Sequence, residues 1–465
     1  MSHFEQVETH GYFWFPEEPD KKQAGKLTIS SPDVIRVELF GIWDDTPSRF
    51  KDILIHRSPK IDCICGTVMD GGEVTLLNCG FHSGSSRHDI DTSTLVVQTA
   101  FVGAGFGKEE MSFNEVYFFV EGLAVWLDES GIDVGDFPFS KGSSIEIRNL
   151  ESIVHSLSGG LTIKFEYNLG HSGISAGTPI TSFRVTQEPL IAIVLDQPKE
   201  IGFFISLALK ISSFLSLAVA HETQVLSVYL PSKGFPIRVY SHMLPHPGEE
   251  KSIYASNVLF TYKDVEASFG ELMSRWLERY NANSIETALN LYFVSKSSKI
   301  RYFDTKFLYL AQGIEVLHQK THPHSRRICK EEFNRKKKEI FASLPEDCPE
   351  FVRQKVSEAN HLSLRERVQE LLEPFKEWFG NDEGGREFAK RVADTRNYLT
   401  HYSSGLEHRA AVGGELINLY EKLETLVLLR ILMQLGFAKH EIASIVQSNH
   451  RLSYVLRVPF QPKKI

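Results

Sequence analysis

The spacing of hydrophobic residues changes its period about halfway along this chain, and this change restricts the fold more than any other feature. Up to about residue 240, apolar and polar residues alternate over short runs, the pattern of half-buried strands. From about residue 267, apolar residues recur at three- and four-residue steps, as in amphipathic helices. A chain of 465 residues is also long for a single core. The sequence therefore predicts an α+β multidomain protein, with a β-rich, sandwich-like domain over residues 1–250 and an all-α helical bundle over residues 251–465.

The β-rich half contains two segments typical of hairpins. KLTISSPDVIRVELFG (26–41) alternates around a Ser-Pro-Asp turn, and TVMDGGEVTLLNCG (67–80) alternates around Asp70-Gly71-Gly72. Further strands are expected at 91–106, 114–127, 143–149, 161–168, 181–187, 223–230 and 235–242. Many short strands at close spacing indicate a sandwich or a barrel-like domain.

An apolar segment at 201–219 is about as long as a membrane span. It carries Lys210 at its centre and four serines, which are costly in lipid, so a buried core helix at about 199–220 is favoured. The N-terminus has no signal-peptide pattern. Five cysteines, an odd number, argue against a disulfide framework and fit a reducing compartment. We therefore expect a cytoplasmic protein without a membrane partner.

After a linker-like stretch at 240–252, the helical period predicts a series of helices. They are expected at 269–280, 285–296, 303–320, 362–375, 386–402 and 414–436. The last is long and almost entirely apolar on one side. It is expected to be either the central helix of a bundle or a helix packed across a dimer interface.

The segment DTRNYLTHYSSG (394–405) places Arg396, Asn397 and His401 near the end of a predicted helix, before the stop signal Ser403-Ser404-Gly405. The negative end of the helix dipole favours a protonated histidine there. Five residues turn an ideal helix by about 140°. Arg396 and His401 therefore meet only if the helix ends between them or a second copy of the chain supplies the partner group.

These residue types suffice for cleavage of RNA without a metal, because the ribose 2′-hydroxyl can attack its own phosphate. A histidine acts as general acid or base. An arginine binds the phosphate and stabilises the transition state, while Asn397 bonds the phosphate or orients the histidine. The alternative is structural: Arg396 caps helix carbonyls or pairs with Asp394, and His401 is a surface residue at the C-cap of the helix.

Two further clusters have weaker functional interpretations. Cys63, Cys65, Cys79 and His82 form a candidate zinc set, although cysteines in a strand are often simply buried. We expect no metal and no cofactor. With a net charge of −8, any RNA-binding surface must be local. The best candidates lie in the basic stretch 326–338, where a solvated helix face is the alternative. They are Arg326, Arg327, Lys336 and Lys337.

Several segments resemble a known family. RNYLTH resembles the R-N-x3-H form of the Rx4-6H motif of HEPN nucleases, and LYLAQGIEVLHQKTHP resembles the first core helix of ApeA-like HEPN domains, with Glu315 and His318 at its Glu-x2-His positions. GYFWFPEEPDKKQAGKLTISSPDVIRVELFG resembles the opening of the ApeA N-terminal domain. GTVMDGGEVTLLNC resembles a later hairpin of that domain. Both domains occur in the expected order.

The resemblance implies an anti-phage defence protein that acts by abortive infection. Its helical HEPN domain would form a homodimer and act as a metal-independent endoribonuclease at a cleft shared by the two subunits. The substrate would be RNA, with tRNA as one candidate. Arg396 and His401 match the catalytic pair, Asn397 the polar neighbour, and Glu315 an acidic position facing the site. The N-terminal domain would act as a sensor or as a restraint on the helical domain. A phage-encoded trigger would be a partner of the protein. The alternative is a non-enzymatic, ligand- or protein-binding β-domain fused to an inactive helical dimerisation module.

Overall fold

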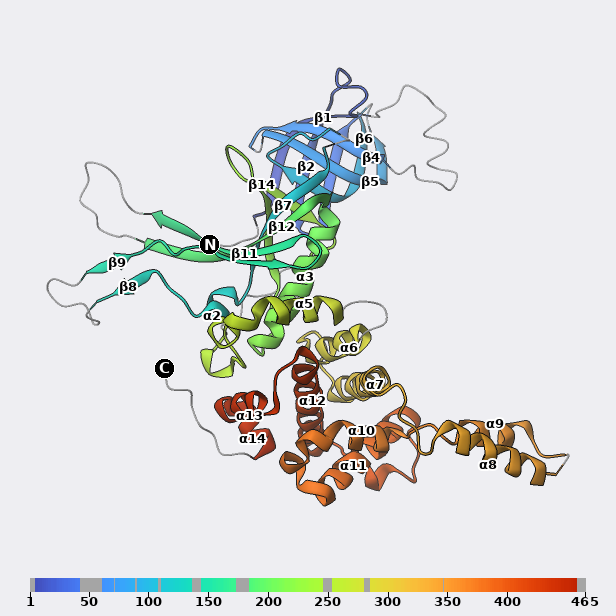
Figure 1. Ribbon diagram of the computed structural model, residues 1–465. Coiled ribbons are helices and arrows are strands. Elements are labelled where there is room, and N and C mark those ends of the chain that lie inside the picture. Colours follow the sequence, from blue (N-terminus) through green and yellow to red (C-terminus); the bar gives the residue numbers. More distant parts are fainter. Residues whose placement is uncertain are drawn as a thin grey trace. The chain divides into compact units, whose positions relative to one another are not determined.

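A computed structural model describes most of the chain (Figure 1). The described residues are 5–41, 61–70, 72–87, 90–107, 110–135, 144–172, 184–245, 253–279, 285–345 and 347–457. The chain divides into two compact units, Met1–Ser274 and Arg275–Ile465, and each is described by itself. Strands make up most of the first unit and helices the second, so the predicted fold class is confirmed.

Six antiparallel strands of the first unit close into a barrel. They are β1 (Val7–Trp14), β2 (Gln23–Ser31), β3 (Val34–Phe40), β4 (Ile61–Val68), β5 (Gly72–Arg87) and β6 (Ile90–Val102). Their order is β6-β3-β2-β1-β4-β5, and β5 pairs with β6 to complete the ring. Closure leaves these strands without the unpaired edges of an open sheet.

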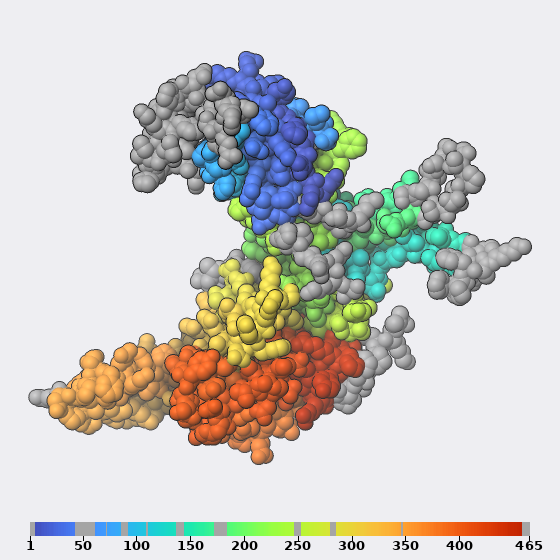
Figure 2. All heavy atoms as spheres, turned by 180° about the vertical axis from the view of Figure 1, so that it is seen from behind, coloured from blue at the N-terminus to red at the C-terminus, as the bar shows by residue number. Residues whose placement is uncertain are grey.

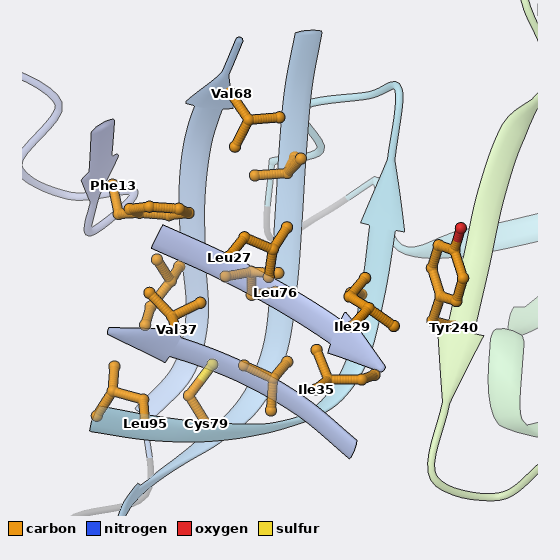
Figure 3. Close-up of a cluster of buried hydrophobic side chains, with 14 of the residues drawn as sticks. Phe13, Leu27, Ile29, Ile35, Val37, Val68, Leu76, Cys79, Leu95 and Tyr240 are labelled. Atoms are coloured by element: carbon orange, nitrogen blue, oxygen red, sulfur yellow. The ribbon is translucent and has the colours of Figure 1, made fainter. Parts of the chain in front are cut away.

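Alternate residues of these strands fill the barrel (Figure 3). In β2, Leu27 and Ile29 are fully buried, and in β3 so are Ile35 and Val37. The period-two alternation that predicted the strands thus supplies the core. Both predicted hairpins are confirmed: β2 ends at Ser31 and β3 begins at Val34, while β4 ends at Val68 and β5 begins at Gly72.

The sheet continues beyond the barrel through six more strands. In sheet order after β6 they are β14 (Ile237–Ser241), β13 (Val225–Leu230), β7 (Ser112–Val120), β12 (Arg184–Glu200), β11 (Leu161–Ser172) and β10 (Ile153–Leu157). β8 (Ile132–Val134) and β9 (Ile145–Ile147) form a separate ribbon. One expectation was wrong in part: the strand predicted over 114–127 ends at Val120, and α2 (Leu123–Leu127) follows. Gly122, with a φ of 80°, turns the chain out of the extended conformation there.

The apolar segment forms α3 (Ile201–Ala218), which packs against β7, β12 and β13. By length and composition it is the one helix among the described residues that is apolar enough to cross a membrane, and 61% of it is buried within the protein. A short helix, α4 (Tyr262–Val265), precedes α5 (Phe269–Arg279). Of the predicted linker 240–252, residues 246–252 lie outside the described part of the chain.

The second unit is helical. Its helices are α6 (Glu286–Lys296), α7 (Phe303–Thr321), α8 (Lys330–Ser343), α9 (Glu350–Glu358), α10 (Leu364–Leu372), α11 (Asn381–His401), α12 (Gly414–Leu435), α13 (Lys439–Ser448) and α14 (His450–Leu456). Helix α12 is buried on most of its surface within one copy of the chain, as expected of the central helix of a bundle. By contrast, α8 and α9 have no buried residue and form an arm that projects from the other helices of this unit (Figures 1 and 2).

A buried charge cluster ties α12 to its neighbours. The carboxylate of Glu424 has no exposed surface. It accepts hydrogen bonds from Tyr292 at 2.8 Å, from Lys296 at 3.0 Å and from Arg451 at 2.7 Å. These donors come from α6 and α14, so one acidic side chain joins three helices.

Candidate functional site

Helix α11 carries the Arg-Asn-His cluster and runs to His401. Tyr402 adopts a left-handed conformation with a φ of 48°, and its N–H bonds the carbonyl of Tyr398, which ends the helix. The stop therefore comes just before the predicted Ser-Ser-Gly signal. Because the helix does not end between Arg396 and His401, one copy of the chain holds these residues about 140° apart around the helix axis.

Arg396 is paired within its own chain. Its guanidinium donates to Glu315 Oε1 on α7 at 3.1 Å and to Asn397 Oδ1 at 3.1 Å. About one third of each side chain of the ion pair is exposed, 34% for Arg396 and 29% for Glu315. Arg367 on α10 donates to the backbone carbonyl of Glu315 at 3.2 Å and steadies α7 at this point. The structure thus brings together Arg396, Asn397 and Glu315.

His401 lies apart from this group as the last residue of α11, with an exposed side chain. The backbone around it is well anchored. Thr400 donates to the carbonyl of Arg396 at 2.7 Å, and the buried hydroxyl of Thr395 accepts a hydrogen bond from the N–H of Ala411. The segment after the helix therefore folds back onto α11 and anchors the backbone near His401, whose side chain is exposed.

The chemistry available to this arrangement is that of an open, exchangeable ion pair. A guanidinium that is one third exposed can exchange a carboxylate for a phosphate, since it binds both in the same forked geometry. Asn397 orients Arg396 rather than His401 in a single copy. Acid–base chemistry by His401 on a phosphate held by Arg396 requires groups from two faces of α11 to meet.

The four residues expected to bind RNA differ in their surroundings. Arg327 forms a clamp at the base of the α8–α9 arm, where it bonds both oxygens of Glu366 and the carbonyl of Ala359. Arg326 donates to loop carbonyls, and Lys336 pairs with Glu332 at 3.0 Å. The Lys337 ammonium lies 5.3 Å from the ring centre of Phe341. Arg326 and Lys336 are exposed and Lys337 is partly buried, whereas the guanidinium of Arg327 is engaged in structural hydrogen bonds.

The four candidate zinc ligands are divided by the barrel wall. Cys79 lies in the barrel core, where burial raises the pKa of its thiol to about 12 (Figure 3). Cys65 donates to the carbonyl of Phe106, and the hydrogen bond that Cys63 donates to Cys65 raises the pKa of Cys63. His82 is exposed. Within the described residues, no group of three or more His, Cys, Asp or Glu side chains is placed to hold a metal ion.

The sequence interpretation missed several polar residues around the end of α7. One carboxylate oxygen of Glu370, on α10, lies 2.7 Å from His318 Nε2. The hydroxyl of Ser325 donates to both oxygens of this carboxylate, each at 2.7 Å. Burial lowers the pKa of His318, and the charges of Arg367 and Arg430 lower it further. Only the Glu-x2-His spacing on α7 hinted at this group, because its other members come from distant segments.

Comparison with known protein families gives two matches. The model of ApeA N-terminal domain 1 matches residues 8–276, which is more than half of the chain, and the model of the Apea-like HEPN domain matches residues 308–441. No curated protein and no solved structure matches. The HEPN match covers α7 through α12, and therefore includes Glu315, Arg396 and His401.

HEPN domains are generally ribonucleases that dimerise and act on RNA, and the match supports a nuclease-type role in anti-phage defence. The barrel with its extended sheet carries the first match and the helical unit carries the second, in that order along the chain. This chain belongs to the ApeA-like HEPN family, with an ApeA N-terminal domain 1 followed by an Apea-like HEPN domain.

Proposed function

We propose that this protein is a metal-independent endoribonuclease that acts in anti-phage defence by abortive infection, with tRNA as a candidate substrate and a phage-encoded component as its trigger. The observation that carries the proposal is the placement of Arg396 and His401 on one continuous helix, with both side chains reaching solvent. A single copy holds them on different faces of α11. Two copies that pair along this helix bring Arg396 of one to His401 of the other.

In this cleft the guanidinium of Arg396 leaves Glu315 and binds the non-bridging oxygens of the scissile phosphate. A neutral His401 takes the proton of the ribose 2′-hydroxyl, and the new bond between O2′ and phosphorus forms as the bond to O5′ breaks. The imidazolium that forms then gives this proton to O5′. The products are a 2′,3′-cyclic phosphate and a 5′-hydroxyl, and the step consumes no water or metal.

Cleavage assays in EDTA test the catalytic pair. We expect His401→Ala and Arg396→Ala each to lower RNA cleavage by at least about a hundredfold and to relieve toxicity in cells. His408→Ala and Arg386→Ala, at exposed positions of the same unit, are the matched controls. Mapping of RNA 5′ ends after induction of wild type beside His401→Ala identifies the target. Cleavage at the wild-type rate by either site variant would contradict the assignment.

Mixing two inactive variants tests the composite cleft. A mixed dimer of Arg396→Ala and His401→Ala retains one arginine and one histidine, on different subunits. If the working pair forms between subunits, mixing restores up to about half of the activity; if it forms within one subunit, mixing restores none. We also expect dimers by light scattering, and a monomer that still cuts RNA would overturn this part of the proposal.

One observation favours a second candidate. Arg396 is satisfied locally by Glu315 and Asn397, as expected of a structural residue in an inactive helical dimerisation module attached to a binding domain. Under this alternative, Glu315→Gln and Arg396→Ala alter stability alone, and no induced RNA cleavage is detected. The cleavage assay above separates the two functions.

A further inference from the structure

We propose that the HEPN domain contains a second anion site, formed by Arg430 with His318 and His322, which takes a phosphate group. This site goes beyond the proposed nuclease function, because it uses none of Arg396, Asn397 and His401. It lies where the end of α7 packs against α12.

Arg430 is the residue that most requires a ligand. Only 6% of it is exposed, and its Nε has no hydrogen-bond partner within the described residues. One terminal nitrogen lies 3.9 Å from the sulfur of Met433, a weak acceptor. Burial lowers the pKa of Arg430, with no carboxylate acting against it. A buried cation left unpaired is strongly unfavourable, so a missing anion is a natural explanation.

The same unit contains an arginine whose charge is satisfied within the chain. Arg451 donates to Glu424 at 2.7 Å, and the charge of that carboxylate raises the pKa of Arg451. Arg430 lies on the same helix as Glu424, yet it has no such partner among the described residues. The chain therefore supplies a counter-ion to Arg451, whose side chain is 40% exposed, while the more deeply buried Arg430 is left for an external anion.

Two histidines, on α7 and at its end, belong to the helix that packs against the helix of Arg430. The rings of His318 and His322 stack with centroids 5.0 Å apart, and the positive charge of Arg430 lowers the pKa of both. His322 interacts with the Thr321 hydroxyl through Nδ1 at 2.8 Å, which leaves Nε2 for a further hydrogen bond. A guanidinium edge and an imidazole nitrogen are a common donor set for phosphate oxygens.

Glu370 is the one carboxylate in this group, and it is already engaged. Both of its oxygens accept from Ser325, and one also contacts His318. Its side chain is 38% exposed and His322 is only partly buried, so the group borders solvent on this side. The proposed ligand is a phosphate group that reaches Arg430 from this side. Free phosphate, a nucleotide and the RNA backbone all present this chemistry.

Thermal unfolding of the full chain with inorganic phosphate tests the site. Against chloride at equal ionic strength, we expect phosphate to raise the Tm of wild type saturably, by at least about 2 °C. Arg430→Met should lose this shift and, without phosphate, be at least as stable as wild type, because an apolar side chain replaces an unpaired buried charge. Arg386→Met, at an exposed position, should keep the shift.

Free phosphate, a nucleotide and the RNA backbone are distinguished by measuring the Tm shift with adenosine 5′-monophosphate and with a short RNA that lacks a terminal phosphate. Both measurements use the His401→Ala variant so that the RNA is not cleaved. The probe whose shift depends on Arg430 identifies the source. Should Arg430→Met fail to fold, His322→Gln is expected to weaken phosphate binding at least about fivefold. No phosphate shift in wild type, or an equal shift in wild type and the site variant, overturns the proposal. Neither outcome bears on cleavage by Arg396 and His401.

Discussion

Two glutamates of the helical unit, Glu424 and Glu315, both bond an arginine from another helix, yet their surroundings differ. Glu424 has no exposed surface, whereas 29% of the Glu315 side chain is exposed. Three groups donate to Glu424: Tyr292, Lys296 and Arg451. Glu315 binds one guanidinium, that of Arg396.

The comparison separates a structural ion cluster from an exchangeable one. Burial alone would raise the pKa of Glu424, yet the charges of Lys296 and Arg451 lower it to about 2. Removing one member leaves the others unpaired in the core. The pair at Glu315 borders water, where an ion pair contributes little to stability, so Arg396 can leave it for a substrate at small cost. The two ion pairs therefore differ in solvent exposure rather than in charge.

The largest expected effect is at Glu424. Because Glu424→Gln leaves Lys296 and Arg451 without a counter-ion, we expect the free energy of unfolding to fall by about 3–5 kcal/mol. Urea denaturation measures the change. The control is Glu387→Gln on the exposed face of α11, which should stay within about 0.5 kcal/mol of wild type. Equal stability of the two variants would contradict a special structural role for the buried carboxylate of Glu424.

A smaller effect is expected at Glu315. Glu315→Gln should cost at most about 1 kcal/mol of stability. If Glu315 positions Arg396, RNA cleavage should nevertheless fall about tenfold, since a misplaced arginine stabilises the transition state poorly. Unfolding and cleavage are measured on the same preparation. A loss of several kcal/mol with cleavage unchanged would make Glu315 a structural residue like Glu424.

The smallest effect is a pH dependence at Glu366, whose side chain is 33% exposed and thus slightly more open than that of Glu315. The hydrogen bond from Arg327 is the main cause that lowers its pKa to about 2. The stabilisation is therefore present above the unfolded pKa of about 4.3 and is lost as the pH falls through the folded value. After allowance for solvent screening, we expect Glu366→Gln to lose about 1 kcal/mol at pH 6 and nothing near pH 2. A difference that stays constant over this range would exclude the carboxylate as its source.

Local patterns predicted the elements well. The hairpin turns between Ser31 and Val34 and between Val68 and Gly72 follow from turn residues flanked by alternating runs. Helices α7, α11 and α12 follow from the 3.6-residue period. The predicted strand over 114–127 was too long because LAVWL is apolar enough for either structure, and Gly122 alone does not reveal on which side of it the helix lies.

Long-range pairings were not predictable in this way. Closure of the barrel by β5 and β6 depends on register across a whole ring of strands. The bond between Arg396 and Glu315 joins residues 81 positions apart, and residue types alone do not name the partner. The family resemblance marked Glu315 as facing the site, but periodicity did not.

By itself, the sequence determined where strands give way to helices, where the hairpins turn and which helix carries Arg396 and His401, because periodicity and turn chemistry act over a few residues. Tertiary structure alone decided that Glu424 is fully buried, that Glu315 is partly exposed and that Arg430 has no counter-ion among the residues that the structure describes. Burial is the sum of contacts from segments far apart in the chain, and burial determines whether a charge stabilises the fold or is available to a ligand.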